Sequence, residues 1–127
     1  MNLNVVNLNV VNLSVVIPCY NELANLENGA LAEVESYLDG ADFSWEVVIV
    51  DDESTDGSRE WLEAWLERKE RTGWRLHTIA HGGKPAAVWA GIEAAVGDIV
   101  LFTDMDQSTP IEEWDKLRGH YDEGYDV

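Results

Sequence analysis

Two short apolar stretches each end in a group of carboxylates, and this pattern limits the possible folds more than any other feature of the chain. Residues 47–50 (Val-Val-Ile-Val) precede Asp51-Asp52, and residues 99–103 (Ile-Val-Leu-Phe-Thr) precede Asp104-Met105-Asp106. Short apolar runs are typical of parallel strands that are buried on both faces. Open parallel sheets bind their ligands outside the carboxyl ends of the strands. The sequence therefore predicts a parallel sheet with a ligand crevice that these aspartates line.

The spacing of the second group favours a metal ion. Asp104 and Asp106 lie two residues apart, so both side chains point to the same side of an extended segment. Carboxylate oxygens suit hard divalent cations, and such cations commonly bind substrate phosphates as well. We therefore expect Mg²⁺ or Mn²⁺ and a nucleotide-linked donor.

The composition indicates one folded and strongly acidic domain. A chain of 127 residues is long enough for a single core, and a hydrophobic fraction of 46% with six Trp argues against disorder. The net charge is −17, and the first 58 residues contain neither Lys nor Arg. Such a surface repels nucleic acid and anionic membranes, so we expect neither as a direct partner. An anionic substrate would need a cation as mediator.

The chain shows no sign of export or membrane insertion. Cys19 is the only cysteine, so no intramolecular disulfide can form and a reducing compartment is the default. No apolar stretch approaches the ~20 residues of a membrane-spanning helix. The N-terminus lacks the basic start and apolar core of a signal peptide. We expect a cytoplasmic location, or the cytoplasmic face of the membrane for a longer protein.

A short repeat precedes a single domain. Residues 2–16 hold three pentads (NLNVV, NLNVV, NLSVV), and only the third continues into a longer apolar run. We interpret residues 1–12 as a repetitive extension and residues 13–127 as the domain. The expected strands are 13–18, 45–51, 75–80 and 98–104, and the expected helices are 22–38, 59–71, 85–96 and 109–119. This alternation predicts an α/β fold, a doubly wound and mostly parallel sheet flanked by helices.

Four motifs in a fixed order extend this interpretation. They are VVIPCYNE at 15–22, VIVDDESTDGS at 48–58, GK at 83–84 and GDIVLFTDMD at 97–106. Together they resemble the N-terminal, nucleotide-binding half of family 2 glycosyltransferases with the GT-A fold. The GK loop and the segment after the last aspartate are similar to the branch that transfers sugars to polyprenyl (dolichyl-type) phosphate. The resemblance covers residues 13–127.

The resemblance implies an activity that this chain would carry only in part. Members of the family transfer a hexose from a UDP- or GDP-sugar with inversion, here to a polyprenyl phosphate or another acceptor. The acceptor site, any catalytic base and any membrane anchor are expected beyond Val127. A truncated, non-catalytic nucleotide-binding module is therefore the alternative function.

The resemblance also assigns roles in donor binding. Pro18, Tyr20 and Glu22 would border the base and ribose of the nucleotide. Asp51 would read the edge of the base. Asp52 has a structural role in our interpretation, in which its side chain binds the turn at 54–57.

The remaining assignments concern the phosphates and the metal. Lys84 follows two glycines at a predicted helix N-terminus, where it can meet phosphate or ribose oxygens. Asp106 would bind the cation, and Asp104 would be shared between the cation and the ribose. His81 has no second ligand at a suitable spacing, so we treat it as a rim residue and not as a metal ligand.

Two other protein classes share parts of this pattern. A signalling receiver domain has a similar length and an acidic pair, but its pair follows the first strand, whereas Asp51-Asp52 follows the second. A sugar-1-phosphate nucleotidyltransferase would need a Gly-rich, Arg-containing loop after the first strand, and residues 19–22 contain neither. Both classes are therefore disfavoured.

Overall fold

The computed structural model describes residues 11–122 of the chain. Its strands are β1 (Leu13–Cys19), β2 (Trp45–Asp51), β3 (Trp74–Thr78) and β4 (Ile99–Phe102). Its helices are α1 (Leu23–Glu27), α2 (Ala30–Asp39), α3 (Ser58–Glu67), α4 (Lys84–Ala94), the short 3₁₀ helix η1 (Ile111–Glu113) and α5 (Trp114–Asp122). Strands and helices alternate as the sequence predicts.

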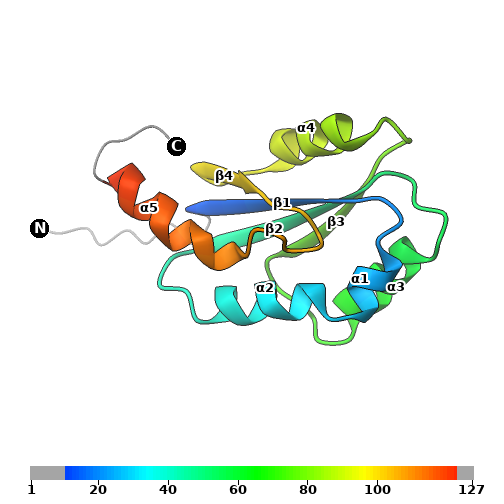
Figure 1. Ribbon diagram of the computed structural model, residues 1–127, viewed down its shortest axis with the longest axis horizontal. Coiled ribbons are helices and arrows are strands. Elements are labelled where there is room, and N and C mark those ends of the chain that lie inside the picture. Colours follow the sequence, from blue (N-terminus) through cyan, green and yellow to red (C-terminus); the bar gives the residue numbers. More distant parts are fainter. Residues whose placement is uncertain (1–10, 123–127) are drawn as a thin grey trace, which may run out of the picture.

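The four described strands form one parallel sheet in the order β3-β2-β1-β4 (Figure 1). In the register, Val16 of β1 lies between Val48 of β2 and Phe102 of β4. The chain builds β1, β2 and β3 in one direction and then returns to place β4 on the other side of β1. The strand order thus reverses between β1 and β4, which is where open α/β sheets bind ligands.

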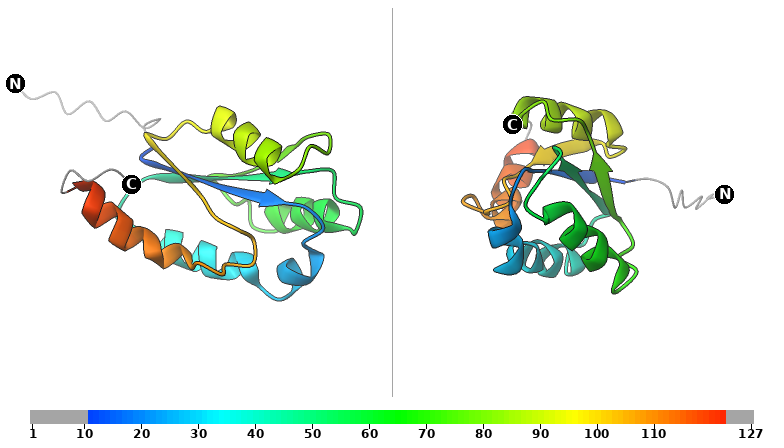
Figure 2. Two further views of the ribbon diagram at one scale, coloured as in Figure 1. Left: turned by 45° about the horizontal axis from the view of Figure 1, so that its top comes forward. Right: turned by 90° about the vertical axis from the view of Figure 1, so that its right-hand side faces the viewer.

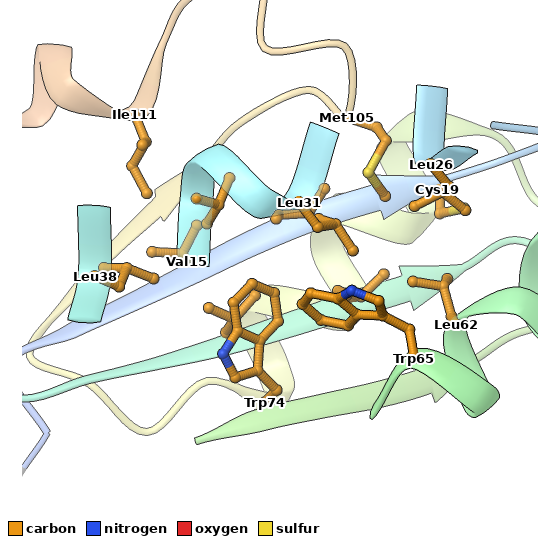
Figure 3. Packing of buried hydrophobic residues seen from close by; sticks show 14 of the residues in the cluster. Val15, Cys19, Leu26, Leu31, Leu38, Leu62, Trp65, Trp74, Met105 and Ile111 are labelled. Carbon is orange, nitrogen blue, oxygen red and sulfur yellow. The ribbon is translucent and has the colours of Figure 1, made fainter. Parts of the chain in front are cut away.

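Helices cover both faces of the sheet (Figures 1 and 2). The larger core lies between the sheet and the layer that contains α2 and α3, and Figure 3 shows its packing. Alternate residues of β1 and β2 point into it, as the period of two requires. Its buried members include Val15, Ile17, Leu31, Leu38, Ile49, Leu62, Trp65, Trp74, Met105 and Ile111. The doubly wound fold is therefore confirmed, and the last two of these residues bring the segment after β4 into the core.

Helix α4 covers the other face and approaches β1 closely. Ala87 packs with Val16, Val48 and Val50 in a second, smaller core. Gly91 lies directly over Val16, and a Cβ atom on Gly91 would overlap the Val16 Cγ1 atom. The small residues of α4 thus let the helix lie close to the sheet.

The close approach of α4 leads to a stability prediction. Gly91→Ala is expected to lower the free energy of unfolding by up to about 2 kcal/mol, because overpacking costs about 1–3 kcal/mol and the better helix propensity of Ala returns about 1. Gly119→Ala is the matched control in α5: its Cβ would meet no atom within 4 Å. Urea unfolding should show Gly119→Ala unchanged or stabilised. Equal effects of both substitutions would contradict the packing account. In the double variant Val16→Ala/Gly91→Ala, the smaller side chain at position 16 should recover part of the stability lost in Gly91→Ala.

Several element boundaries differ from the predictions. The helix expected at 22–38 is two helices, because Gly29 adopts φ 88° and its left-handed conformation ends α1 before α2 begins. Helix α3 ends at Glu67, four residues before the predicted end at 71. Strand β4 ends at Phe102, so the aspartates after it lie in a turn and not in a strand.

The predicted extension at residues 1–12 is described only at its end. Residues 1–10 lie outside the described part of the chain. The Asn12 N–H donates to the Ser44 carbonyl oxygen at 3.2 Å, and the Asp98 N–H donates to the Val11 carbonyl oxygen at 3.1 Å. Val11 and Asn12 therefore lie against the amino-terminal ends of the strands. Among the described helices, none has the length and apolar character required to cross a membrane.

Candidate functional site

A cavity of about 280 Å³ opens at the carboxyl ends of the strands, next to the point where the strand order reverses. Its walls come from the end of β1, the loop after β2, the loop before α4 and the turn after β4. Six of the seven predicted site residues line it: Pro18, Tyr20, Glu22, Lys84, Asp104 and Asp106. The structure therefore brings together residues that are up to 88 positions apart in the sequence.

Asp51 is the predicted site residue that does not line the cavity. Its side chain is fully buried, and its carboxylate accepts hydrogen bonds from the Ser54 hydroxyl (2.6 Å) and the Ser54 N–H (3.2 Å). Asp51 follows Val47 and Ile49 with the period of the strand, so it points toward the larger core. Asp51 thus stabilises the turn that was predicted to depend on Asp52.

Asp52 takes a different place, and the prediction that it binds the 54–57 turn is wrong. Its carboxylate is only 2% exposed and accepts from the Gly82 N–H at 2.8 Å and the Gly83 N–H at 3.0 Å. Asp52 Oδ2 also lies 2.8 Å from Nδ1 of His81. Asp52 lines the cavity and holds the loop that precedes α4.

Lys84 is the first residue of α4 and faces the turn after β4. Its Nζ lies 2.6 Å from Oδ1 of Asp104, and both side chains are about half exposed. A cation at a helix N-terminus that also carries free N–H groups favours an anionic ligand. The structure therefore places Lys84 beside the predicted metal ligands.

The turn after β4 presents its two carboxylates on one side. Met105 is 1% exposed and packs in the larger core, which fixes the middle of the turn. Asp104 and Asp106 on either side of it both line the cavity. Gln107 adopts φ 53° and its Nε2 donates to the Asp104 carbonyl oxygen at 2.8 Å, so Gln107 braces the turn.

These two carboxylates suit a divalent cation in part of its coordination sphere. Both supply the oxygen ligands that Mg²⁺ and Mn²⁺ prefer. Within the described residues, no group of three or more His, Cys, Asp or Glu side chains could hold a metal ion. A cation at Asp104 and Asp106 would therefore take its other ligands from substrate and water, as Mg²⁺ usually does in phosphate-binding sites.

Hydrogen bonds between two loops fix the β1–α1 segment that carries Tyr20 and Glu22. Asn21 adopts φ 52°, and its side-chain oxygen accepts from the Thr55 N–H at 2.8 Å. The Glu22 N–H donates to the Ser58 hydroxyl oxygen at 2.9 Å. The Leu23 N–H donates to Asp56 Oδ2 at 3.1 Å. The motif at 48–58 thus stabilises the conformation of the motif at 15–22 through these hydrogen bonds.

Cys19 also lines the cavity but is unsuited to act as a nucleophile. Burial, followed by the nearby charge of Asp51, raises the pKa of the Cys19 thiol to about 12. The thiol is therefore protonated at neutral pH, and only a thiolate is a strong nucleophile.

Comparison with known proteins identifies the family. Residues 14–127 match the model of glycosyl transferase family 2. The chain belongs to glycosyltransferase family 2. It is 39% identical over 114 residues to an undecaprenyl-phosphate 4-deoxy-4-formamido-L-arabinose transferase of Aeromonas hydrophila, and 36% identical over 112 residues to the enzyme of that name from Pseudomonas syringae. Both alignments cover 88% of this chain and about a third of the relative (34% and 33%).

Two solved structures show a similar fold. The mannosyltransferase PcManGT of Pyrobaculum calidifontis, in complex with GDP-Man and Mn²⁺, aligns with a TM-score of 0.68 at 28% identity, over 84% of this chain and 30% of that one. S. aureus TarS in complex with UDP aligns with a TM-score of 0.64 at 26% identity, over 89% and 32%. The predicted GT-A fold is confirmed, and the receiver-domain alternative is excluded.

Proposed function

We propose that this chain is the donor-binding part of a glycosyltransferase that moves a hexose from a UDP- or GDP-sugar, with inversion, to polyprenyl phosphate. The observation that carries the proposal is the cavity at the carboxyl ends of β1 and β4, where Lys84, Asp104 and Asp106 meet. The relatives named above are undecaprenyl-phosphate transferases, and the solved structures contain GDP-Man or UDP.

Asp104 and Asp106 would hold Mg²⁺ or Mn²⁺ together with the phosphates of the donor. The bound cation supplies charge neutralisation for the diphosphate leaving group. Lys84 would exchange its contact with Asp104 for a phosphate oxygen, adding a second positive charge. The mannosyltransferase with GDP-Man and Mn²⁺ supports this metal use.

The nucleoside end of the donor would lie along Pro18, Tyr20 and Glu22. Of the acidic pair, Asp52 and not Asp51 would lie beside the nucleoside, because the Asp52 side chain lines the cavity and the Asp51 carboxylate is buried against Ser54. Glu22 is held by Asn25, whose Nδ2 donates to Glu22 Oε2 at 2.7 Å.

Polyprenyl phosphate is a suitable acceptor on chemical grounds. Its phosphate is ionised at neutral pH, so its attack on the sugar requires little help from a general base. The chain spans about a third of the length of the curated relatives it matches, so transfer itself is proposed for the whole protein. The second candidate is a nucleotide-binding module without catalysis, which would use the same cavity to bind the nucleotide.

Thermal unfolding in the presence of nucleotides tests donor binding. UDP or GDP at a hundred times its Kd, with Mn²⁺, should stabilise the folded chain by about 2.7 kcal/mol. Omitting Mn²⁺ should remove most of this shift, and ADP serves as the control nucleotide. If neither UDP nor GDP stabilises a chain that is demonstrably folded, the proposal is wrong. If a nucleotide does stabilise the chain, a sugar-transfer assay of the whole protein decides between the enzyme and the non-catalytic module.

A further inference from the structure

The side chains of the cavity form two groups with different chemistry. Lys84 and Asp104 are paired at 2.6 Å and, with Asp106, form a charged group suited to a diphosphate and its cation. The second group is aromatic: the rings of Tyr20 and His81 lie 4.7 Å apart between centroids, with an interplanar angle of 32°. Both rings line the same cavity.

Contacts with Asp52 and Glu53 hold His81 in place. Its Nδ1 lies 2.8 Å from Oδ2 of Asp52, and the Asp52 carboxylate is itself anchored by the N–H groups of Gly82 and Gly83. The backbone N–H of His81 donates to Oε1 of Glu53 at 3.2 Å. A histidine whose one ring nitrogen contacts a buried carboxylate has a defined ring orientation.

The rest of the ring remains accessible. The His81 side chain is 53% exposed, and within the described residues no hydrogen bond engages its Nε2. A planar, oriented and exposed ring beside Tyr20 has the properties of a stacking surface for a nucleobase, since every base has a π-face that aromatic side chains can cover.

We propose that His81 is a base-binding residue of the donor site, which extends the Tyr20 surface and is oriented by Asp52. This inference rests on the proposed function. In this arrangement the base binds to the aromatic group, Tyr20 and His81, and the diphosphate and the cation bind to the charged group of Lys84, Asp104 and Asp106. It replaces the view, taken from the sequence, that His81 is a rim residue.

The two ends of the cavity can be probed separately. UDP and GDP report on both ends, whereas inorganic pyrophosphate with Mg²⁺ reports on the charged group alone. Isothermal titration of the full chain with these three ligands would be carried out for wild type, His81→Ala and His77→Ala. His77 is an exposed histidine on β3, so it provides a control of the same residue type.

The expected result is selective. His81→Ala should weaken the nucleotide about tenfold, which corresponds to the lower part of the range for base stacking, and should change pyrophosphate binding by less than twofold. His77→Ala should change neither. In wild type, nucleotide binding in Mg²⁺ should shift the ring resonances of His81 and leave those of His77 in place.

The other outcomes separate this inference from the proposed function. If the nucleotide binds with metal dependence but His81→Ala leaves its Kd within twofold, the role of His81 is overturned and the proposed function stands. An equal loss of pyrophosphate and nucleotide would mean that His81 acts through the loop before α4, which also overturns base binding. If no nucleotide binds the folded wild type, both proposals fall.

Discussion

Replacing Asp106 by Asn is expected to abolish metal-dependent binding of the nucleoside diphosphate while leaving the fold intact. The carboxylate of Asp106 accepts one hydrogen bond, from the Ser108 N–H at 3.0 Å, and Asn can accept the same bond through its side-chain oxygen. The change therefore removes one negative charge and replaces an anionic metal ligand by a neutral amide. We expect affinity to fall on the order of a hundredfold or more, because even outer-shell substitutions at metal sites cost about 10–100-fold.

A charge-matched control separates the site from the general acidity of the chain. Asp98→Asn also removes one negative charge, but Asp98 lies in the loop before β4, at the opposite end of the strand from the cavity. Titration calorimetry with Mn²⁺ and the preferred nucleotide should show near-normal affinity for Asp98→Asn. Similar losses in both variants would mean that the cation binds through net charge and not through Asp104 and Asp106.

The second large effect is expected on stability, at the amino-terminal edge of the sheet. Glu46 is 6% exposed, and its Oε2 accepts from the Ser14 hydroxyl at 2.6 Å and from the Val96 N–H at 2.7 Å. Its Oε1 accepts from Arg75 at 2.7 Å, and Arg75 also donates to the Ala94 carbonyl oxygen. Glu46 therefore ties β1, β2 and β3 to the segment between α4 and β4.

Glu46→Gln should lower the free energy of unfolding by about 2–3 kcal/mol at neutral pH. The NH₂ group of the Gln amide would face one of the hydrogen-bond donors (Ser14 and Val96, or Arg75) from which the carboxylate now accepts. The ion pair with Arg75 would also be lost, and breaking a buried ion pair costs about 3–5 kcal/mol. We take a lower value because the Arg75 side chain is half exposed, which weakens its contribution. Glu93→Gln, on the exposed side of α4, is the matched control and should change stability by less than about 0.5 kcal/mol.

The effect of Glu46 should depend on pH. Burial alone would raise the pKa of Glu46, but the hydrogen bonds from Ser14, Val96 and Arg75 outweigh burial and hold the pKa below its ordinary value. A carboxylate with a lowered folded-state pKa contributes stability above its unfolded pKa of about 4.3, and this stability is lost as the pH falls through the folded value. The unfolding curves of wild type and Glu46→Gln should therefore converge below about pH 4. A difference that stays constant from neutral pH into this acid range would contradict the account.

The sequence predicted the sheet and most of the site because both depend on local patterns. The apolar runs at 47–50 and 99–103 indicated strands, and the carboxyl ends of parallel strands meet at one edge. The first run is buried on both faces as expected, but β4 lies at the edge of the described sheet, where Val100 is 36% and Phe102 55% exposed. These patterns place Asp104 and Asp106 at that edge, whereas Lys84 was predicted from its position after two glycines at a helix N-terminus; all three line the same cavity.

The assignments within the Asp51-Asp52 pair depended on information that the sequence does not contain. Strand alternation shows that Asp51 shares a face with Val47 and Ile49, but not that this face meets α3 instead of the loop before α4. The bond between Asp52 and His81 spans 29 residues and follows from how α4 returns across the sheet. The break at Gly29 could have been found, because Asn28-Gly29 is a common turn signal.

The location of the cation is the most direct test of the account. Mn²⁺ broadens the NMR signals of nearby amides, so titrating the ¹⁵N-labelled chain with Mn²⁺ and UDP or GDP maps the metal. We predict that signals of residues 82–84 and 103–107 disappear first, while those of Ser14 and Gly97 at the other end of the sheet persist. Broadening centred on the acidic surface of α3, or unaffected by the nucleotide, would contradict a metal-dependent donor site between β1 and β4.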